Sequence, residues 1–341
     1  MGLLLRIGFV LLLLGGCVLF PASAPPRFPE FQEKVIASGS VYLLPQWSKD
    51  GQYLAYIDIR SETLQVSDTN SETTWTVATR VGYANYSWAS NGELSYLVYR
   101  PDLSGSPFPS IYDLHQVSLR GTNDRIIAHS LSNPTDFIWM SDNKRLLILL
   151  EEQKQIGQYR TNNVYMLDLE TGQLELYLES LELGLTHIEM FALSTDETVL
   201  MIYGMTGQQS EPVHMLVYDL ELNTIRKRIV SRQVVPSESA NDPQLYPALG
   251  GSRNDEWVAG DRWFLAVVNA PTGECYNYAL FFLDAIDTSN SFCIPSQGII
   301  ADPILSPDLT HIAYINVVGP GQEFLMVGNF PDAIKERLQS P

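Results

Sequence analysis

Residues Pro45 to Ile57 read Pro-Gln-Trp-Ser-Lys-Asp-Gly-Gln-Tyr-Leu-Ala-Tyr-Ile, and the rest of the chain repeats this pattern. An apolar approach ends at Trp47, a short polar segment follows, and an aromatic-rich apolar run starts at Tyr53. Asp50 and Gly51 are typical of a tight turn, because aspartate can bind its own backbone two residues on and glycine adopts positive φ at no steric cost. The stretch therefore predicts two antiparallel strands joined by a turn, here named A and B.

Five weaker copies of this hairpin follow along the chain. Each has an Asp or Asn turn residue, and the six turn residues are Asp50, Asn91, Asp142, Asp196, Asp261 and Asp308. They are separated by 41, 51, 54, 65 and 47 residues, which is too long for the coils of a solenoid and typical of propeller blades. A second hairpin follows the first, as where Val164–Asp168 leads into Gln173–Leu178. The predicted fold class is therefore all-β, a six-bladed β-propeller with four antiparallel strands, A to D, in each blade.

The chain resembles the TolB-like family of six-bladed, WD40-like β-propellers, whose repeats read Trp-Ser-Pro-Asp-Gly before an apolar strand. The likeness is clearest at Trp47–Gly51 and Leu305–Asp308, and it extends over roughly residues 33–330. Some copies depart from the family pattern, since Asn91 stands in place of Asp and Asn143 in place of Gly, and the fifth copy lacks Trp and Ser. The resemblance implies protein partners in the cell envelope.

The sixth unit lacks a fourth strand. Residues 331–341 form a C-terminal tail with only a short helix-forming segment, Ala333–Leu338. We expect Lys34–Ser38, upstream of the first copy, to supply the missing outer strand. This N-terminal strand would close the ring and remove the exposed sheet edge that an open repeat array leaves.

Residues 1–16 form a predicted lipoprotein signal peptide, with an early charge at Arg6 before an apolar run. Leu14-Gly15-Gly16-Cys17 resembles the bacterial lipobox, which implies cleavage before Cys17 and a lipid on its thiol; residues 17–32 are then a lipid anchor and Pro-rich tether. Two alternatives stay open. One is cleavage after Ala24, where Pro25 should hinder the cut, and the other is an uncleaved spanning helix over Leu3–Phe20. The lipobox reading places the protein outside the cytoplasm, anchored to a bacterial cell membrane.

The charge balance excludes some partners. Acidic residues outnumber basic ones by 39 to 21, which gives a net charge of −18. Nucleic acid binding needs Lys and Arg on phosphates, so this composition argues against nucleic acid and against docking on an anionic membrane by charge. We expect one soluble, monomeric propeller domain.

Cys275 and Cys293 are a possible disulfide in an exported protein. If residues 284–290 join strands C and D of the fifth blade, Cys293 lies opposite a residue near Phe281. Cys275 would then be about six residues away, and at ~3.3 Å per residue this exceeds disulfide reach unless a bulge intervenes. A disulfide and two buried thiols both stay open.

Catalytic motifs are missing from the sequence, which has no nucleophile elbow, phosphate-binding loop, zinc-protease motif or calcium loop. We therefore expect no enzyme activity, no metal and no cofactor. His187 and Glu189 could ligate a metal from one strand face, but no third ligand is near. The recurring turn carboxylates have a structural role in their own turns. Trp47, Trp88 and Trp139 are expected to pack between blades rather than to stack on a ligand.

Long insertions fall on one face of the predicted disc, the face of the B-to-C and D-to-A connections. They are Pro101–Ser110, Glu151–Asn162, Gly204–Val213, Asn269–Glu274 and the longest, Ser231–Trp257. Loops on a rigid scaffold are the usual place for binding, although an irregular loop without a ligand is the plain alternative. Carboxylates mixed with aromatic residues suit a glycan or peptide, so the candidate ligand-binding residues are Glu238, Asp242, Tyr246, Arg253, Asp255, Glu256, Trp257 and Glu274.

These features predict a membrane-anchored, extracytoplasmic binding or scaffold protein whose loop-rich face binds an envelope protein or glycan. One alternative is a propeller enzyme that acts on a glycan or lactone at the central channel. Another is a regulatory propeller resembling that of prolyl-oligopeptidase-type proteins.

Overall fold

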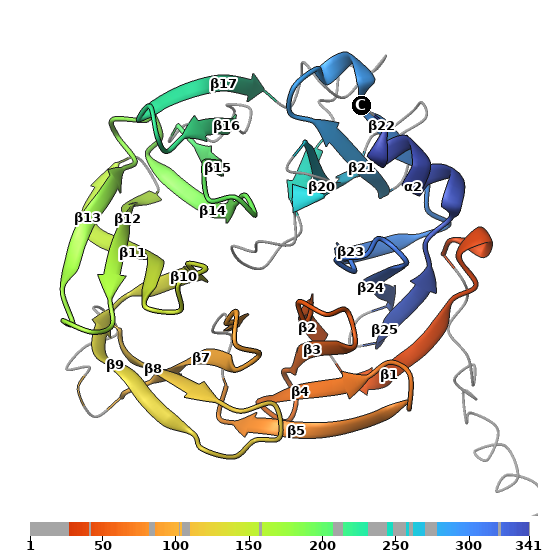
Figure 1. Cartoon of the computed structure of the whole chain (residues 1–341), viewed down its shortest axis with the longest axis horizontal. Helices are drawn as coiled ribbons and strands as arrows, with labels where there is room; N and C mark the ends of the chain where they lie inside the picture. The colour runs from red at the N-terminus through yellow and green to blue at the C-terminus, as the bar shows by residue number, and fades with distance from the viewer. Residues whose placement is uncertain are drawn as a thin grey trace, which may run out of the picture.

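The computed structural model describes residues 27–40, 42–81, 86–101, 103, 110–156, 159–206, 214–230, 244–247, 257–258, 262–269, 278–319 and 322–340. These residues form six antiparallel β-sheets arranged in a ring (Figure 1). The predicted six-bladed propeller is confirmed. None of the helices in the described part of the chain is long and apolar enough to cross a membrane.

Blades 1 to 4 follow the order of the chain from the inner to the outer strand. Blade 1 contains β2 (Tyr42–Trp47), β3 (Tyr53–Asp58), β4 (Thr63–Asp68) and β5 (Thr73–Thr79). Blade 2 contains β6 (Tyr86–Trp88), β7 (Leu94–Tyr99), β8 (Ile111–Val117) and β9 (Arg125–Ser132). Blade 3 contains β10 (Pro134–Trp139), β11 (Arg145–Ile156), β12 (Tyr159–Asp168) and β13 (Leu174–Glu179). Blade 4 contains β14 (His187–Leu193), β15 (Val199–Met205), β16 (His214–Asp219) and β17 (Thr224–Val230).

Blade 6 is built from both ends of the propeller. It contains β23 (Ile299–Leu305), β24 (His311–Gly319) and β25 (Gln322–Asn329), and its outer strand is β1 (Lys34–Ser40). Lys34 lies opposite Val327, and Ser40 lies opposite Glu323. The predicted closure of the ring by an N-terminal strand is confirmed.

Blade 5 corrects one prediction from the sequence. Its inner position is shared by β18 (Gln244–Pro247) and β19 (Trp257–Val258), which both pair with β20 (Trp263–Asn269). The blade continues with β21 (Ala279–Asp284), a 3₁₀ helix η3 (Thr288–Asn290) and β22 (Phe292–Ile294). The prediction of Ser231–Trp257 as one loop is therefore wrong. The inner segment is only four residues long, and Pro247, which has no N–H for the ladder, ends it.

Blade 3 corrects a second prediction, because Glu151–Asn162 is not a loop. β11 continues to Ile156 and β12 begins at Tyr159, with Gln155 opposite Arg160. The segment is polar and lacks the alternation that marks a strand with one buried face, so the sequence pattern hides it. Likewise, Gly204 and Met205 still belong to β15, and Asn269 still belongs to β20.

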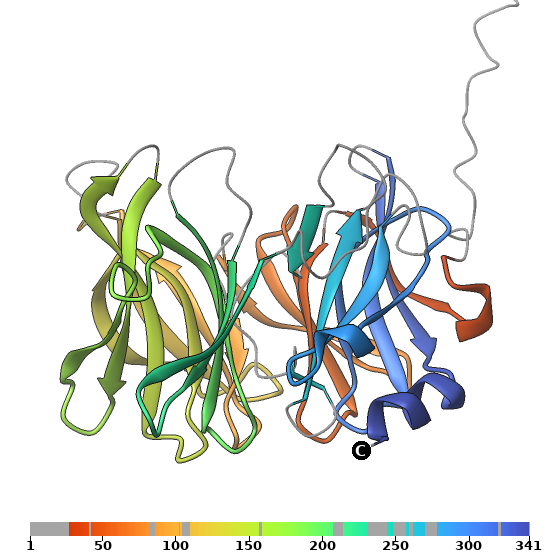
Figure 2. The ribbon, with the colours of Figure 1, turned by 90° about the horizontal axis from the view of Figure 1, so that it is seen from above.

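The ring has two unlike faces (Figure 2). The A-to-B and C-to-D turns lie on one face, here called the turn face, together with helix α2 (Asp332–Gln339). The B-to-C and D-to-A connections lie on the other, here called the loop face.

Buried side chains between neighbouring blades form the core. An apolar cluster fills each of the six interfaces, and each combines residues from two adjacent blades. Trp47 and Trp139 donate their ring N–H groups to the preceding blade, to the Ile304 carbonyl at 3.3 Å and the Ser95 hydroxyl at 3.2 Å. The blades are therefore held by apolar packing at every interface between neighbouring blades, here called a seam, and by hydrogen bonds across several of these seams.

Asn162 provides the clearest polar link between blades 3 and 4. Its side chain donates to the Ile188 carbonyl at 2.6 Å and accepts from the Ile188 N–H at 2.7 Å, and it is fully buried. We expect Asn162→Ala to lower the free energy of unfolding by about 2 kcal/mol, because two buried backbone groups lose their partner. Urea denaturation would measure this, with Asn70→Ala, at an exposed turn position, as the control expected within ~0.5 kcal/mol of the parent. Equal effects of the two substitutions would contradict the prediction.

The two ends of the described chain both brace the seam between blades 5 and 6. Phe28 and Phe31, which flank and end the 3₁₀ helix η1 (Pro29–Phe31), are buried in the apolar cluster of that seam. On the turn face, the predicted helix near residues 333–338 is observed as α2, whose Leu338 carbonyl accepts the Trp263 ring N–H at 3.0 Å. The Arg337 guanidinium lies 3.7 Å from the centre of the Phe292 ring.

Arg27 fixes the entry of the chain on the loop-face side of the same seam. Its Nε donates to Asn316 Oδ1 at 2.6 Å, and its Nη1 donates to the Gln297 carbonyl at 2.9 Å. The Arg27 carbonyl accepts from the Gln297 N–H at 2.9 Å. Its guanidinium also occupies the space that a Cβ on Gly298 would need, at 2.2 Å.

Cys293 lies opposite Phe281 in the β21–β22 pair, so the predicted register near Phe281 is confirmed. Cys293 is disulfide-bonded, which excludes a free thiol at this position. Cys17 and Cys275, the other two cysteines of the chain, lie outside the described residues. Pairing of Cys293 with Cys275 stays a prediction.

Candidate functional site

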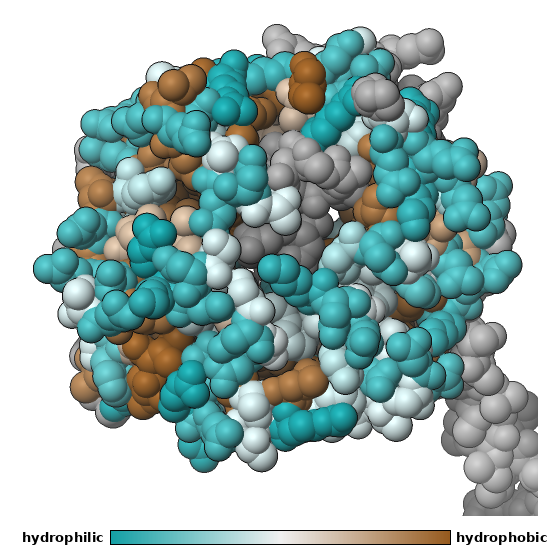
Figure 3. Space-filling model, viewed as in Figure 1, coloured by the Kyte–Doolittle hydropathy of each residue, from teal (hydrophilic) through white to brown (hydrophobic). Residues whose placement is uncertain are grey.

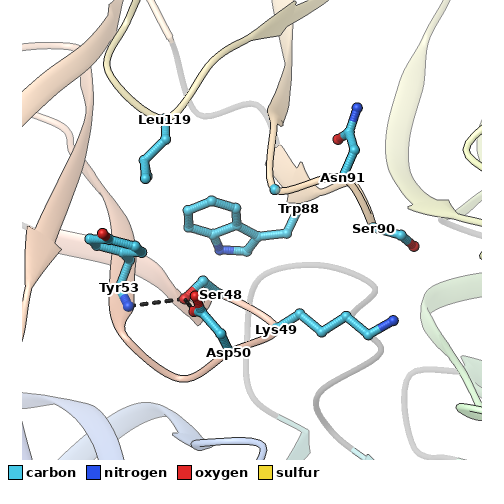
Figure 4. Close-up of a pocket in the computed structure, with 9 residues that line it drawn as sticks. Ser48, Lys49, Asp50, Tyr53, Trp88, Ser90, Asn91 and Leu119 are labelled. Atoms are coloured by element: carbon cyan, nitrogen blue, oxygen red, sulfur yellow. Dashed lines mark hydrogen bonds between the residues drawn. The ribbon is translucent and has the colours of Figure 1, made fainter.

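A groove opens on the turn face between blades 1 and 2 (Figure 4). Its volume is about 360 Å³, and the residues that line it are Ser48, Lys49, Asp50, Tyr53, Trp88, Ser90, Asn91, Gly92 and Leu119. Pockets for small ligands begin at roughly 300 Å³, so the groove can hold one small ligand or one unit of a longer one. On the surface of this face, apolar side chains show only as separate patches among hydrophilic ones (Figure 3).

One side of the groove is apolar. Trp88, at the end of β6, lies beside Tyr53 and Leu119 on this side (Figure 4). The Trp88 ring N–H donates to the Gln46 carbonyl of blade 1 at 3.3 Å. The Tyr53 N–H donates to the Ser48 hydroxyl at 2.9 Å. The first bond fixes the Trp88 indole and the second fixes the backbone at Tyr53 before any ligand arrives.

Trp88 departs from the role predicted for it. Trp47 and Trp139 stand at the same position of the repeat and are each 2% exposed, as expected of residues that only pack between blades. Trp88 also bonds across its seam, but it is only partly buried and lines the groove. It therefore both packs between blades and offers aromatic surface to a ligand.

The outer wall of the groove is fixed by the C-to-D turn of blade 2, which is bound to blade 1. The Trp75 ring N–H of β5 donates to the Leu119 carbonyl at 2.7 Å, and the Arg120 guanidinium lies 4.2 Å from the centre of the Trp75 ring. At Gly121, with φ of 74°, a Cβ would lie 3.0 Å from the Val77 carbonyl oxygen. Only glycine permits this close approach, which positions Leu119 over the groove.

The opposite side of the groove is polar (Figure 4). The Asp50 carboxylate accepts from the Ser48 hydroxyl at 2.6 Å and the Gln52 N–H at 3.1 Å, and Asn91 accepts from the Glu93 N–H at 3.0 Å. Lys49 is exposed, and no described residue bonds to its ammonium group. The carboxylate and amide are thus held by their own turns, whereas the Lys49 ammonium is available to a ligand.

The predicted ligand-binding residues on the loop face have no described side chains. Glu238, Asp242, Arg253, Asp255, Glu256 and Glu274 lie outside the described residues, while Tyr246 and Trp257 are described only as backbone positions of β18 and β19. The proposed binding site there stays a prediction. The same holds for Cys17, which also lies outside the described residues.

The turn residues of the repeat bind their own turns. The Asp142 carboxylate accepts from the Lys144 N–H at 2.8 Å, and the Asp196 and Asp308 carboxylates each accept from the N–H two residues on at 3.0 Å. Asp50 and Asn91 make the corresponding bonds, and Asp261 lies outside the described residues. These side chains form turns rather than a ligand-binding ring.

Two of the described histidines are held by protein groups. The His187 Nδ1 lies 2.8 Å from the Arg160 carbonyl oxygen, and the His115 Nδ1 lies 3.1 Å from an Asp124 carboxylate oxygen. The Tyr96 hydroxyl donates to the same carboxylate at 2.9 Å; burial, followed by this carboxylate, raises the pKa of Tyr96 well above its ordinary value. No group of three His, Cys, Asp or Glu side chains able to hold a metal ion occurs among the described residues.

Comparison with known proteins shows the fold of the chain. No family model and no curated protein sequence matches it. Among solved structures, a gluconolactonase from Xanthomonas campestris is 13% identical with a TM-score of 0.55, covering 90% of this chain and 91% of the other. TolB from Acinetobacter baumannii is 14% identical with a TM-score of 0.55, covering 83% of this chain and 64% of the other.

A third similar structure is regucalcin, a calcium-binding protein from Agrobacterium tumefaciens. It is 13% identical with a TM-score of 0.52, and the match covers 90% of this chain and 98% of the other. Propellers with different named roles thus share this architecture. At these identities the likeness describes the scaffold alone, because one fold carries many unrelated sites.

Proposed function

We propose that the protein is a binding protein of the bacterial cell envelope that holds a small ligand, or one unit of a larger glycan or peptide, in the groove between blades 1 and 2. The observation that carries the proposal is the partly exposed indole of Trp88, which lies beside Tyr53 and Leu119 and faces the polar side of the groove. Apolar floors with a few fixed polar groups are typical of small-molecule sites. The groove is held open by bonds within the protein, so little ordering is needed on binding.

We also propose the location predicted from the sequence, in which a lipid on Cys17 anchors the protein outside the cytoplasm. Binding rather than catalysis is proposed because the polar groups Asp50 and Asn91 are engaged in their own turns. The loop face is proposed as a second, larger surface for an envelope protein. Lactone hydrolysis by the purified protein would contradict a purely binding role.

Photocrosslinking in intact cells tests the site. A photoreactive amino acid at Ser90, whose exposed side chain is on the groove, should form an adduct with the ligand, and mass spectrometry of the adduct would identify it. The same amino acid at Leu222, which is 71% exposed in the C-to-D turn of blade 4, is the control and should not form that adduct. Identical adducts at both positions, or no adduct at Ser90, would argue against the groove as the site.

A further inference from the structure

The groove is open because of the residue at one position of the repeat, the position after the turn Asp or Asn. In five described turns this residue has positive φ, with values of 70° at Gly51, 80° at Gly92, 53° at Asn143, 59° at Glu197 and 58° at Leu309. The backbone is therefore alike in these turns. What differs is the side chain that the position presents to the preceding blade.

In two of the seams this side chain bridges the neighbouring turns. Asn143 Oδ1 of blade 3 accepts from the Ser90 N–H of blade 2 at 2.8 Å. In the next seam, Glu197 Oε1 of blade 4 accepts from the Ser141 N–H of blade 3. Each bridge brings an amide or carboxylate oxygen to a backbone N–H at the same position of the preceding turn.

The seam between blades 6 and 1 needs no such bridge. There the N–H position is taken by Pro307, which has no N–H to satisfy. A Cβ on Gly51 would lie 3.8 Å from the Pro307 ring, in ordinary van der Waals contact. At these two turns, glycine on one side and proline on the other therefore meet without a bridging side chain.

The seam between blades 1 and 2 has the backbone N–H group but lacks the side chain that would accept from it. Lys49 stands at the N–H position, but the residue across from it is Gly92, and a Cβ built there would meet nothing within 4 Å. Within the described part of the chain, no group accepts a hydrogen bond from the Lys49 N–H. The groove is thus the space that a bridging side chain fills in the next two seams.

We propose that the ligand supplies the missing oxygen to Lys49, and that it is the acetamido oxygen of an N-acetylated sugar. This inference rests on the proposed binding function of the groove. The carbonyl oxygen of an acetamido group has the chemistry of the Asn143 amide oxygen, and the sugar ring can pack its C–H groups on Trp88 beside Leu119. An amide oxygen is chosen because the bridge in the adjacent seam, from the Ser90 N–H to Asn143, uses one.

Gly92→Asn is the decisive variant. Asparagine tolerates positive φ, as Asn143 does at the same position, so the substitution should leave the fold intact. The new amide would bond to the Lys49 N–H and fill the groove. We expect calorimetric binding of a β-1,4-linked N-acetylglucosamine trimer to weaken at least ~10-fold, which corresponds to about 1.4 kcal/mol.

Two controls make the test specific. Glu197→Gly removes the natural bridge between blades 3 and 4, whose partner Ser141 does not line the groove, and it should leave binding of the trimer unchanged. Amide hydrogen exchange at Lys49 should slow when the trimer binds to the parent protein, and it should already be slow in Gly92→Asn without a sugar. A structural effect of the substitution alone would not reproduce the slowing by the sugar.

The outcomes separate this inference from the proposed function. Equal binding of a glucose trimer that lacks acetamido groups, abolished by Gly92→Asn, would overturn the acetamido assignment while the groove remains the binding site. An acidic peptide crosslinked at Ser90, with no binding of the N-acetylated trimer, would do the same. If no ligand responds to Gly92→Asn and none is captured at Ser90, the proposed function fails as well.

Discussion

Replacing Phe31 with alanine is expected to lower the free energy of unfolding by about 3–5 kcal/mol. Phe31 is 1% exposed, and its ring lies 4.7 Å from the Phe28 ring and 5.9 Å from the Phe330 ring. It fills the seam between blades 5 and 6, next to the outer strand β1. Removal of the ring leaves a cavity in this seam. Because β1 begins only three residues after Phe31, the cavity lies next to the strand that closes the propeller.

Urea denaturation followed by tryptophan fluorescence would measure the loss. Leu222→Ala is the matched control, since this large apolar side chain is 71% exposed and its removal should change stability by less than ~0.5 kcal/mol. A loss below about 1 kcal/mol for Phe31→Ala would mean that the N-terminal segment is not part of the folded ring.

Replacing Asp284 with alanine is expected to cost about 2–3 kcal/mol at neutral pH, because it removes the carboxylate that accepts from Arg262 and from two backbone N–H groups of the turn. The Asp284 carboxylate is fully buried and accepts from Arg262 Nη2 at 2.7 Å and Nε at 3.0 Å. It also accepts from the N–H groups of Ile286 at 2.9 Å and Asp287 at 3.0 Å. One side chain thus organises the C-to-D turn of blade 5.

The same contacts predict a pH dependence. Burial by itself would raise the pKa of Asp284, but the bonds from Arg262 and from the two N–H groups outweigh burial and hold the pKa below its ordinary value. A lowered pKa in the folded state contributes stability above the unfolded pKa of about 3.9, and this contribution is lost as the pH falls through the folded value.

The stability difference between the parent and Asp284→Asn should therefore be constant between about pH 5 and 8 and should shrink as the pH drops below ~4. Denaturation curves at pH 7, 5 and 3 would show this. Glu175→Gln, at an exposed position of β13, is the control and should show no such trend. A difference at pH 3 as large as that at pH 7 would contradict the assigned role of the charge.

Local turn chemistry explains why so much of the ring could be predicted. Asp50, Asp142 and Asp308 bind N–H groups two residues on, and such turns form wherever the local sequence allows. The need to cover an open sheet edge made β1 predictable as well. The turn signal depends on residues close in sequence, and the prediction of β1 depends on a general requirement of sheets.

Features without a local signal escaped prediction. β18 is four residues long and depends on pairing with β20 farther along the chain, and the extension of β11 and β12 is polar in sequence, so no apolar alternation marks it. A deletion of Ser231–Trp257 would accordingly remove part of the inner strand of blade 5, not only a loop. The sequence prediction treated Gly92 and Asn143 as variants of one turn position. The two differ in whether a side chain reaches the preceding blade, as Asn143 does to the Ser90 N–H.

The position of Arg27 sets how the disc would stand on a membrane. Arg27 is bound beside Gln297 and Asn316 on the loop-face side. Cys17 lies about ten residues earlier, so at ~3.5 Å per residue a lipid on Cys17 would keep Arg27 within ~35 Å of the bilayer. The loop face would then be turned toward the lipid surface, and the groove, which lies on the turn face, would open toward the surrounding compartment, where a soluble or wall-bound sugar could reach it.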